Sequence, residues 1–121
     1  MLFKIRFESS KPIYQQMRDQ IILAMAKEEL LPGENLPSVR QLAKDIGVNP
    51  MTVSKVYSQL KDQGYIIIDR RHGASLRSAE DVKKENTDYL IEELELILSE
   101  AKLKGMTKKE LEGIIQGIYK D

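Results

Sequence analysis

The sequence has no cysteine and only one histidine, His72, among its 121 residues. Without cysteine the chain can form no disulfide and offers no thiolate to a metal ion. It also has no run of 18 or more apolar residues and no secretion-signal pattern at its start, which argues against a transmembrane helix and against export. We therefore expect a globular protein of the cytoplasm, with no part in a membrane.

The residues that enzymes use for catalysis are also scarce. No glycine-rich phosphate loop follows a predicted strand, and the acidic residues of the last third lie mostly on a predicted solvated helix face. An active site needs acids, bases, nucleophiles or metal ligands that converge on one place. We therefore do not expect an enzyme, a metal site or a bound cofactor.

The formal net charge is zero, but the charge is unevenly distributed. Residues 1–78 hold 12 Lys and Arg against 8 Asp and Glu, whereas residues 79–121 hold 7 against 11. A chain of this length is normally one domain, at most with a small appendage. The opposite signs predict two parts with different roles, with the boundary between residues 78 and 79.

The first part is predicted to open with an arm and a helix. Residues 2–7 alternate apolar with basic side chains, as in a short strand or an extended arm. Pro12 suits the first position of a helix that runs to about Glu29. Pro32 and Gly33 then break the chain. The inner face of this helix is predicted to hold Tyr14, Met17, Ile21, Ala24 and Met25.

Two amphipathic helices follow with only two residues between them. Ser38 and Gln41 form a capping box at the start of the first helix, and Gly47 is a natural stop at its end. Asn49 reads as the N-cap of the second helix, and Pro50 as its first residue, where no amide is needed. So short a link makes the helices cross, which predicts a helix-turn-helix. The inward side chains are Val39, Leu42, Ala43 and Ile46, then Val53, Val56, Tyr57 and Leu60.

The outer face of the second helix is short and polar. Met51, Lys55 and Ser58 point outward with Thr52 and Ser54 beside them, and no acid occurs before residue 62. On an isolated helix such a face is ordinary solvated surface. Its position in a helix-turn-helix favours a binding surface instead.

A strand–turn–strand pattern comes next. Residues 65–68 favour a strand, residues 69–73 a turn, and residues 74–77 a return strand. Arg70, Arg71 and His72 form the densest positive cluster of this half, at the tip of the ribbon. A two-stranded ribbon after a helix-turn-helix is a wing, so a winged helix is predicted over residues 1–78.

The last part, residues 79–121, predicts two amphipathic helices. Gly105 ends the first, and Thr107 with Glu110 caps the second. About forty residues cannot close a core alone, so this hairpin packs either on the winged helix or on a second copy of the chain. We expect a dimerisation hairpin that uses Leu90, Leu94, Ile97, Leu98 and Ala101 of the first helix and Leu111, Ile114, Ile115 and Ile118 of the second.

The motifs "KPIYQQ", "LPG", "LPSVRQLA", "IGVNPMTV", "VYSQL" and "GYI", in this order and spacing, resemble the DNA-binding domain of GntR-type bacterial transcription regulators. The "PSVR" spelling and the short helical tail are similar to the small YtrA-like branch. The resemblance implies a mainly α, winged helix-turn-helix protein with a two-helix dimerisation hairpin. It further implies a homodimer that binds double-stranded DNA at an inverted-repeat operator and represses transcription.

The resemblance also implies which residues meet DNA. The second helix of the motif enters the major groove, the wing reaches the minor groove, and an arginine matching Arg40 contacts DNA. The implied set is Arg40, Met51, Thr52, Ser54 and Lys55, with Arg70, Arg71, His72 and Gly73 at the wing. Two departures stand out. Many relatives carry polar or basic residues in place of Pro50 and Met51, and their wings have two glycines near the tip where this one has Gly73.

Other roles fit the same pattern. A winged helix can also serve as a protein–protein interaction module that binds no DNA. RNA is disfavoured, because a recognition helix suits the major groove of B-form DNA and not the narrow A-form groove. The larger GntR regulators carry an effector domain of more than a hundred residues, for which residues 79–121 leave no room. The sequence identifies neither an effector nor the operator.

Overall fold

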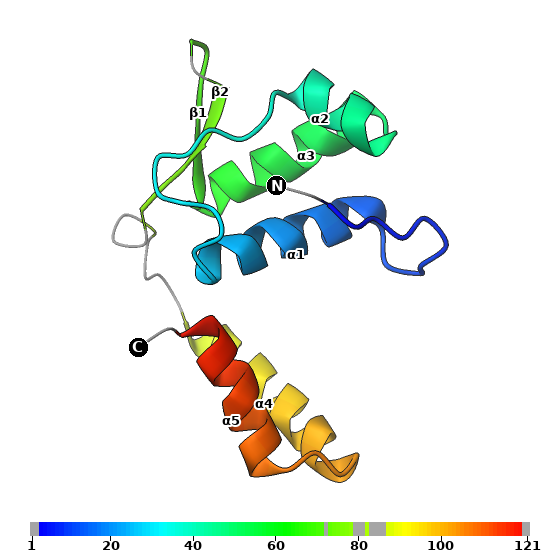
Figure 1. Ribbon diagram of the computed structural model, residues 1–121, viewed down its shortest axis with the longest axis vertical. Helices are drawn as coiled ribbons and strands as arrows, with labels where there is room; N and C mark the ends of the chain where they lie inside the picture. The colour runs from blue at the N-terminus through cyan, green and yellow to red at the C-terminus, as the bar shows by residue number, and fades with distance from the viewer. Residues whose placement is uncertain (1–2, 72, 79–81, 83–86, 120–121) are drawn as a thin grey trace. The chain divides into compact units, whose positions relative to one another are not determined.

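The computed structural model describes residues 3–71, 73–78, 82 and 87–119, and the chain divides into two units, Met1–Val82 and Lys83–Asp121 (Figure 1). The sequence had placed this division four residues earlier. His72 lies outside the described residues. The fold is mainly helical with one small antiparallel sheet, as predicted. Its elements are α1 (Ile13–Ala26), α2 (Val39–Ile46), α3 (Pro50–Asp62), β1 (Ile66–Asp69), β2 (Gly73–Leu76), α4 (Asp88–Leu103) and α5 (Lys108–Ile118).

Helix α1 is shorter at both ends than predicted. Pro12 is its N-cap and not its first residue. The helix stops at Ala26 because Glu28 adopts a left-handed conformation with φ of 61°, and the amides of Glu29 and Leu30 turn back to the Ala24 carbonyl at 2.8 and 3.2 Å. This is the usual left-handed ending of a helix, here without the glycine that would mark it in a sequence.

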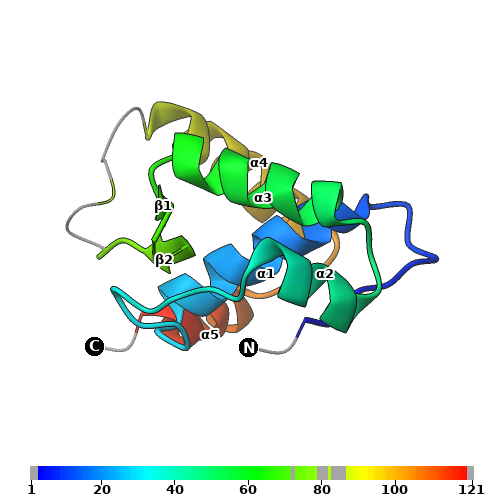
Figure 2. The ribbon, with the colours of Figure 1, turned by 90° about the horizontal axis from the view of Figure 1, so that it is seen from above.

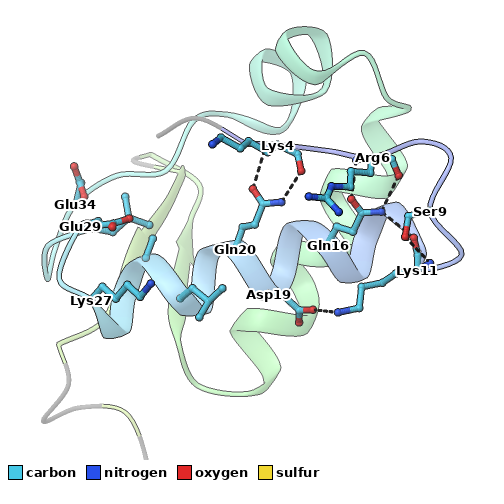
Figure 3. A pocket seen from close by; sticks show the side chains of 13 residues that line it. Lys4, Arg6, Ser9, Lys11, Gln16, Asp19, Gln20, Lys27, Glu29 and Glu34 are labelled. Atoms are coloured by element: carbon cyan, nitrogen blue, oxygen red, sulfur yellow. Dashed lines mark hydrogen bonds and ion pairs between the residues drawn. The ribbon is translucent and has the colours of Figure 1, made fainter. Parts of the chain in front are cut away.

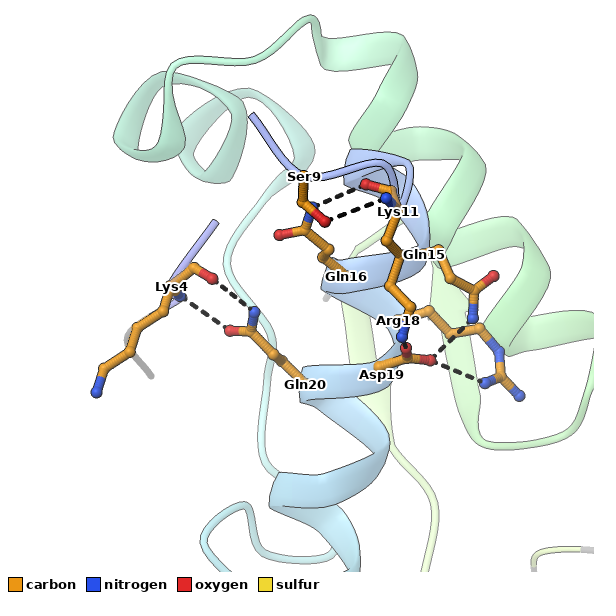
Figure 4. Close-up of polar contacts among 8 residues, drawn as sticks. All are labelled: Lys4, Ser9, Lys11, Gln15, Gln16, Arg18, Asp19 and Gln20. Carbon is orange, nitrogen blue, oxygen red and sulfur yellow. Dashed lines mark hydrogen bonds and ion pairs between the residues drawn. The ribbon is translucent and has the colours of Figure 1, made fainter. Parts of the chain in front are cut away.

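The N-terminal arm is an extended segment and not a strand. Its backbone is held by two glutamine side chains of α1. Each side-chain amide both accepts from the N–H and donates to the carbonyl of one arm residue, as the backbone of a neighbouring strand would. The Lys4 amide donates to Gln20 Oε1 at 2.9 Å and Gln20 Nε2 donates to the Lys4 carbonyl at 3.0 Å, as Figure 4 shows. Gln16 does the same at Arg6, at 2.8 and 3.0 Å. The spacings match, because four residues of helix rise about 6 Å and two residues of extended chain about 6.6 Å.

Helix α2 has only half of the predicted capping box. Ser38 Oγ accepts from the Gln41 amide at 3.2 Å, as expected. The Gln41 side chain does not reach back to Ser38, because it donates to Asp45 Oδ1 one turn further along at 2.7 Å. Gly47 ends the helix with φ of 83°, a conformation that costs glycine little.

The core of the first unit lies where α1, α2 and α3 pack together with the base of the ribbon (Figure 2). All four inward residues predicted for α3 are buried, and two of the five predicted for α1 are fully inaccessible, Met17 and Ile21. The arm adds Phe3 and Ile5 at the edge of this core. The buried apolar side chains are Met17, Ile21, Ala24, Leu30, Leu36, Leu42, Ala43, Val53, Val56, Tyr57, Leu60, Ile66, Ala74 and Leu76.

The wing is built as an antiparallel pair, β1 with β2, in which Ile66 faces Leu76 and Asp69 faces Gly73. The first strand begins and the second ends within one residue of the prediction. The segment after α1 adds a short third edge: the Leu36 amide donates to the Ala74 carbonyl at 2.8 Å and the Leu76 amide to the Glu34 carbonyl at 3.0 Å. This pairing was not predicted, because "LPGEN" has no strand-like alternation.

The second unit holds α4 and α5, joined at Gly105 and capped at Thr107 as predicted, with Thr107 Oγ1 accepting from the Glu110 amide at 3.1 Å. None of residues 87–119 is buried. Within the described ranges, no helix combines the length and the apolarity needed to cross a bilayer.

Candidate nucleic-acid interface

The start of α3 is held by the Asn49–Pro50 pair. Asn49 Oδ1 accepts from the Met51 amide at 2.8 Å, and the Asn49 carbonyl accepts from the Thr52 amide at 2.9 Å. Pro50 has no amide to satisfy. The first turn of α3 therefore offers a ligand its side chains and not its backbone N–H groups.

The outer face of α3 carries two hydroxyl side chains, a lysine and a methionine, most of them exposed. Ser54 and Lys55 are exposed, Met51 is 78% exposed, and Thr52 is half-buried beside them. No acidic residue lies between positions 50 and 61. Short hydroxyl, ammonium and thioether groups let a helix approach base edges closely in a major groove. The structure thus brings the four predicted α3 residues onto one side of one helix.

Tyr57 joins the two helices of the motif through a hydrogen bond. Its hydroxyl donates to the Pro37 carbonyl, just before α2, at 2.6 Å. Burial raises the pKa of Tyr57 from 10.0 to about 12, because the phenolate would lose its hydration. The neutral hydroxyl is therefore the form that links α3 to the start of α2.

Arg40 lies in the first turn of α2 and is exposed. Ser38 caps the Gln41 amide, and within the described part of the chain no acceptor meets the amides of Val39 and Arg40. Free amides at a helix N-terminus together with a guanidinium make a favourable place for an anion. This suits a phosphate better than a base edge.

The wing tip is a short turn ordered by Asp69, whose Oδ1 accepts from the Arg71 amide at 2.8 Å. Gly73 closes the turn with φ of 73°, which explains why a glycine stands there. Arg70 and Arg71 are exposed. The predicted wing residues thus project from a defined turn, apart from His72, which is not described.

One contact of the outer face was missed by sequence reasoning. The Lys55 ammonium lies 4.0 Å from the centroid of the Tyr14 ring, a cation–π geometry. Tyr14 was assigned to the inner face of α1, where it is half-buried. The motif "KPIYQQ" contained the residue but gave no sign of its partner 41 positions away.

A depression of about 740 Å³ lies beside the arm and α1, lined among others by Lys4, Arg6 and Lys11 (Figure 3). Its buried and half-buried polar side chains, Gln16, Asp19 and Gln20, are bonded within the chain, whereas Lys4 and Arg6 are exposed. Gln16 is bonded at both ends of its amide, and Lys11 pairs with Asp19 at 2.8 Å. This depression shows no unpaired buried group that would call for a ligand.

Comparison with known proteins places this geometry in a family. Residues 10–76 match the family described as bacterial regulatory proteins, gntR family. The uncharacterized HTH-type transcriptional regulator YhcF of Bacillus subtilis is 41% identical over 111 residues, which cover 90% of this chain and 92% of YhcF. The HTH-type transcriptional repressor YtrA of the same organism is 34% identical over 122 residues, covering 99% and 94%.

Comparison with solved structures agrees with this family assignment. The structure of YtrA from Sulfolobus acidocaldarius, a GntR-family transcription factor, superposes with a TM-score of 0.65 at 39% identity, covering 85% of this chain and 99% of that one. These relatives are transcription regulators and not enzymes.

Proposed function

The chain belongs to the GntR family of bacterial regulatory proteins, and from this premise we propose that it is a cytoplasmic repressor that binds an inverted-repeat DNA operator as a homodimer. DNA-binding transcription regulation is the activity of the family itself. To this family activity the proposal adds three points: the protein recognises a specific DNA sequence, it binds as a two-fold symmetric dimer, and it represses transcription. The repressor role draws on the similarity to YtrA, which bears that description.

The observation that carries the proposal is the exposed polar face of α3. Ser54 and Lys55 supply hydrogen-bond donors, and Ser54 also an acceptor, for base edges. The exposed Met51 suits contact with a thymine methyl group. Because the first-turn amides of α3 are used by its cap, we expect these side chains to carry the sequence discrimination.

Phosphate contacts come from the elements on either side. Arg40 and the free amides at the start of α2 suit one phosphate, which fixes the position of the protein without reading sequence. Arg70, Arg71 and Gly73 stand at the wing tip for a second contact, in or beside the minor groove. In this proposal the start of α2 and the wing tip contact phosphates on either side of the bases that α3 reads.

The homodimer rests on the second unit. Its helices expose Leu90, Leu94 and Ile97 by 49%, 55% and 60%, and a contiguous exposed apolar face of this kind is typical of an interaction surface. A two-fold dimer would place two α3 helices about 34 Å apart, one turn of DNA, which is the spacing an inverted repeat requires. The half-buried Ala101, Leu111 and Ile118 lie on the same two helices.

The test is selection of bound sequences from random duplex DNA at two salt concentrations. We expect a palindromic consensus and an affinity that falls linearly on a log–log plot, by about 0.9 per phosphate neutralised. Arg40→Ala is expected to lower that slope by about one, whereas Lys102→Ala in α4 leaves it unchanged. No selected consensus and no salt slope would favour a protein–protein interaction module instead.

The sign of regulation needs a separate measurement. Transcription in vitro from a promoter that overlaps the selected site is expected to fall as the protein is added. A rise would overturn the repressor assignment and leave the DNA-binding assignment intact.

A further inference from the structure

The contact between Lys55 and Tyr14 joins the outer face of α3 to a different helix. Lys55 is exposed on α3, while Tyr14 lies in the first turn of α1 and packs against the core. The ammonium lies 4.0 Å from the ring centroid. A side chain on the proposed DNA-facing surface is thus held at its charged end by a residue outside the helix-turn-helix.

The two cations nearest to Tyr14 in sequence, Lys11 just before α1 and Arg18 on it, have other partners. Lys11 pairs with Asp19 at 2.8 Å, and Arg18 Nε donates to Gln63 Oε1 at 3.0 Å, with its guanidinium 3.7 Å from Asp19. Figure 4 shows both cations directed to that carboxylate. In the described part of the chain, the Tyr14 ring is therefore occupied by Lys55 and not by its closer neighbours in sequence.

Holding Lys55 has a physical consequence for recognition. A lysine side chain loses more rotamer freedom than most when it is fixed. If the ring already restricts it in the free protein, less is lost when DNA binds. An ammonium above a ring face directs only part of its N–H groups at the ring, and Lys55 remains exposed, so the others are available to an acceptor on DNA.

We propose that Tyr14 is a positioning residue of the DNA interface, whose ring holds the Lys55 ammonium in the orientation in which it meets the DNA. Tyr14 itself need not touch DNA. It sharpens discrimination at the base pair that Lys55 reads. This inference rests on the proposed function and adds a specificity-determining residue that lies outside the recognition helix.

The test compares Tyr14→Leu, Tyr14→Phe, Lys55→Ala and the Tyr14→Leu/Lys55→Ala double variant. Each is titrated with the duplex selected by the wild-type protein and with a set of its single-base-pair variants. Tyr14→Leu is expected to weaken binding about two- to fivefold, the value of an exposed cation–π contact. Tyr14→Phe retains the ring face and should bind like the wild type.

The decisive measurement is whether the effects of the Tyr14 and Lys55 substitutions on DNA affinity depend on each other. In the Lys55→Ala background, Tyr14→Leu is expected to have no further effect, and in the wild-type background it should relax preference at the same base pairs as Lys55→Ala. A purely structural role would instead weaken all duplexes alike in both backgrounds. That result, or tighter binding by Tyr14→Leu, overturns the inference.

Two controls keep the outcome clear. Thermal unfolding of each variant shows whether the first unit is folded, and Tyr14→Met, unbranched and without a ring, replaces Tyr14→Leu if that variant unfolds. Failure of the wild-type protein to select any duplex overturns the proposed function. Selection by the wild type without coupling overturns only the role of Tyr14.

Discussion

Replacing Leu94 and Ile97 of α4 with glutamate is expected to convert the proposed dimer to monomers. In the single chain these side chains are 55% and 60% exposed. Burying a whole Leu or Ile contributes about 1.5–3 kcal/mol, so covering the exposed half contributes about 1–2 kcal/mol. A symmetric dimer with this face at its interface would bury four such side chains, or about 4–8 kcal/mol, and losing this would raise the dimer Kd by about 10³ to 10⁶.

Sedimentation equilibrium of the double variant and the wild type measures this change directly. The matched control is Leu96→Glu/Leu103→Glu, the same chemical change on the same helix but on the side away from the Leu90–Leu94–Ile97 row. Those residues are 61% and 85% exposed, so they should tolerate glutamate without loss of the dimer. An unchanged dimer for Leu94→Glu/Ile97→Glu, or equal loss in both variants, would refute the assignment of this face.

Further predictions concern three residues of the first unit, Tyr57, Asn49 and Gln59, and are measured by chemical unfolding. Tyr57→Phe is expected to cost about 1–2 kcal/mol at pH 7, because the carbonyl of the half-buried Pro37 loses its donor. The pKa of Tyr57 is raised to about 12 in the folded chain, so the unfolded chain releases that proton at a lower pH. Wild-type stability should therefore fall by about 2 kcal/mol from pH 10 to 12 relative to Tyr57→Phe. Asn49→Ala removes the cap of Met51 and should cost about 1 kcal/mol, with Asn49→Asp as the conservative control. Gln59→Met should stabilise by up to about 1 kcal/mol, since Gln59 Oε1 is buried and has no hydrogen-bond partner among the described residues. A loss of stability would show that the oxygen is satisfied.

The parts of the fold that were predicted depend on chemistry within a few residues. Asn49 and Pro50 start a helix because a side-chain acceptor and a missing amide suit its first turn, and Gly47 ends one because it tolerates positive φ. The buried face of α3 follows from a 3.6-residue period. Such signals are local, so a sequence displays them directly.

The parts that were missed depend on pairs distant in sequence. The glutamines that hold the arm, the pairing of Leu36 with β2, and Tyr14 beneath Lys55 each join elements whose relative position only packing determines. The early end of α1 is a different case. Glu28 takes a conformation that favours glycine, and no local signal marked it.

The zero net charge of the chain is compatible with DNA binding because charges act locally. At physiological salt the Debye length is about 8 Å, so phosphates respond to the residues next to them and not to the total. The α3 face carries Lys55 and no acid up to residue 61, while the acidic excess belongs to residues 79–121. Non-specific DNA binding is almost wholly electrostatic. In this chain the positive excess is confined to residues 1–78. Its affinity for DNA should therefore depend more on side-chain contacts to bases, and less on total charge, than the affinity of a uniformly basic protein of this size.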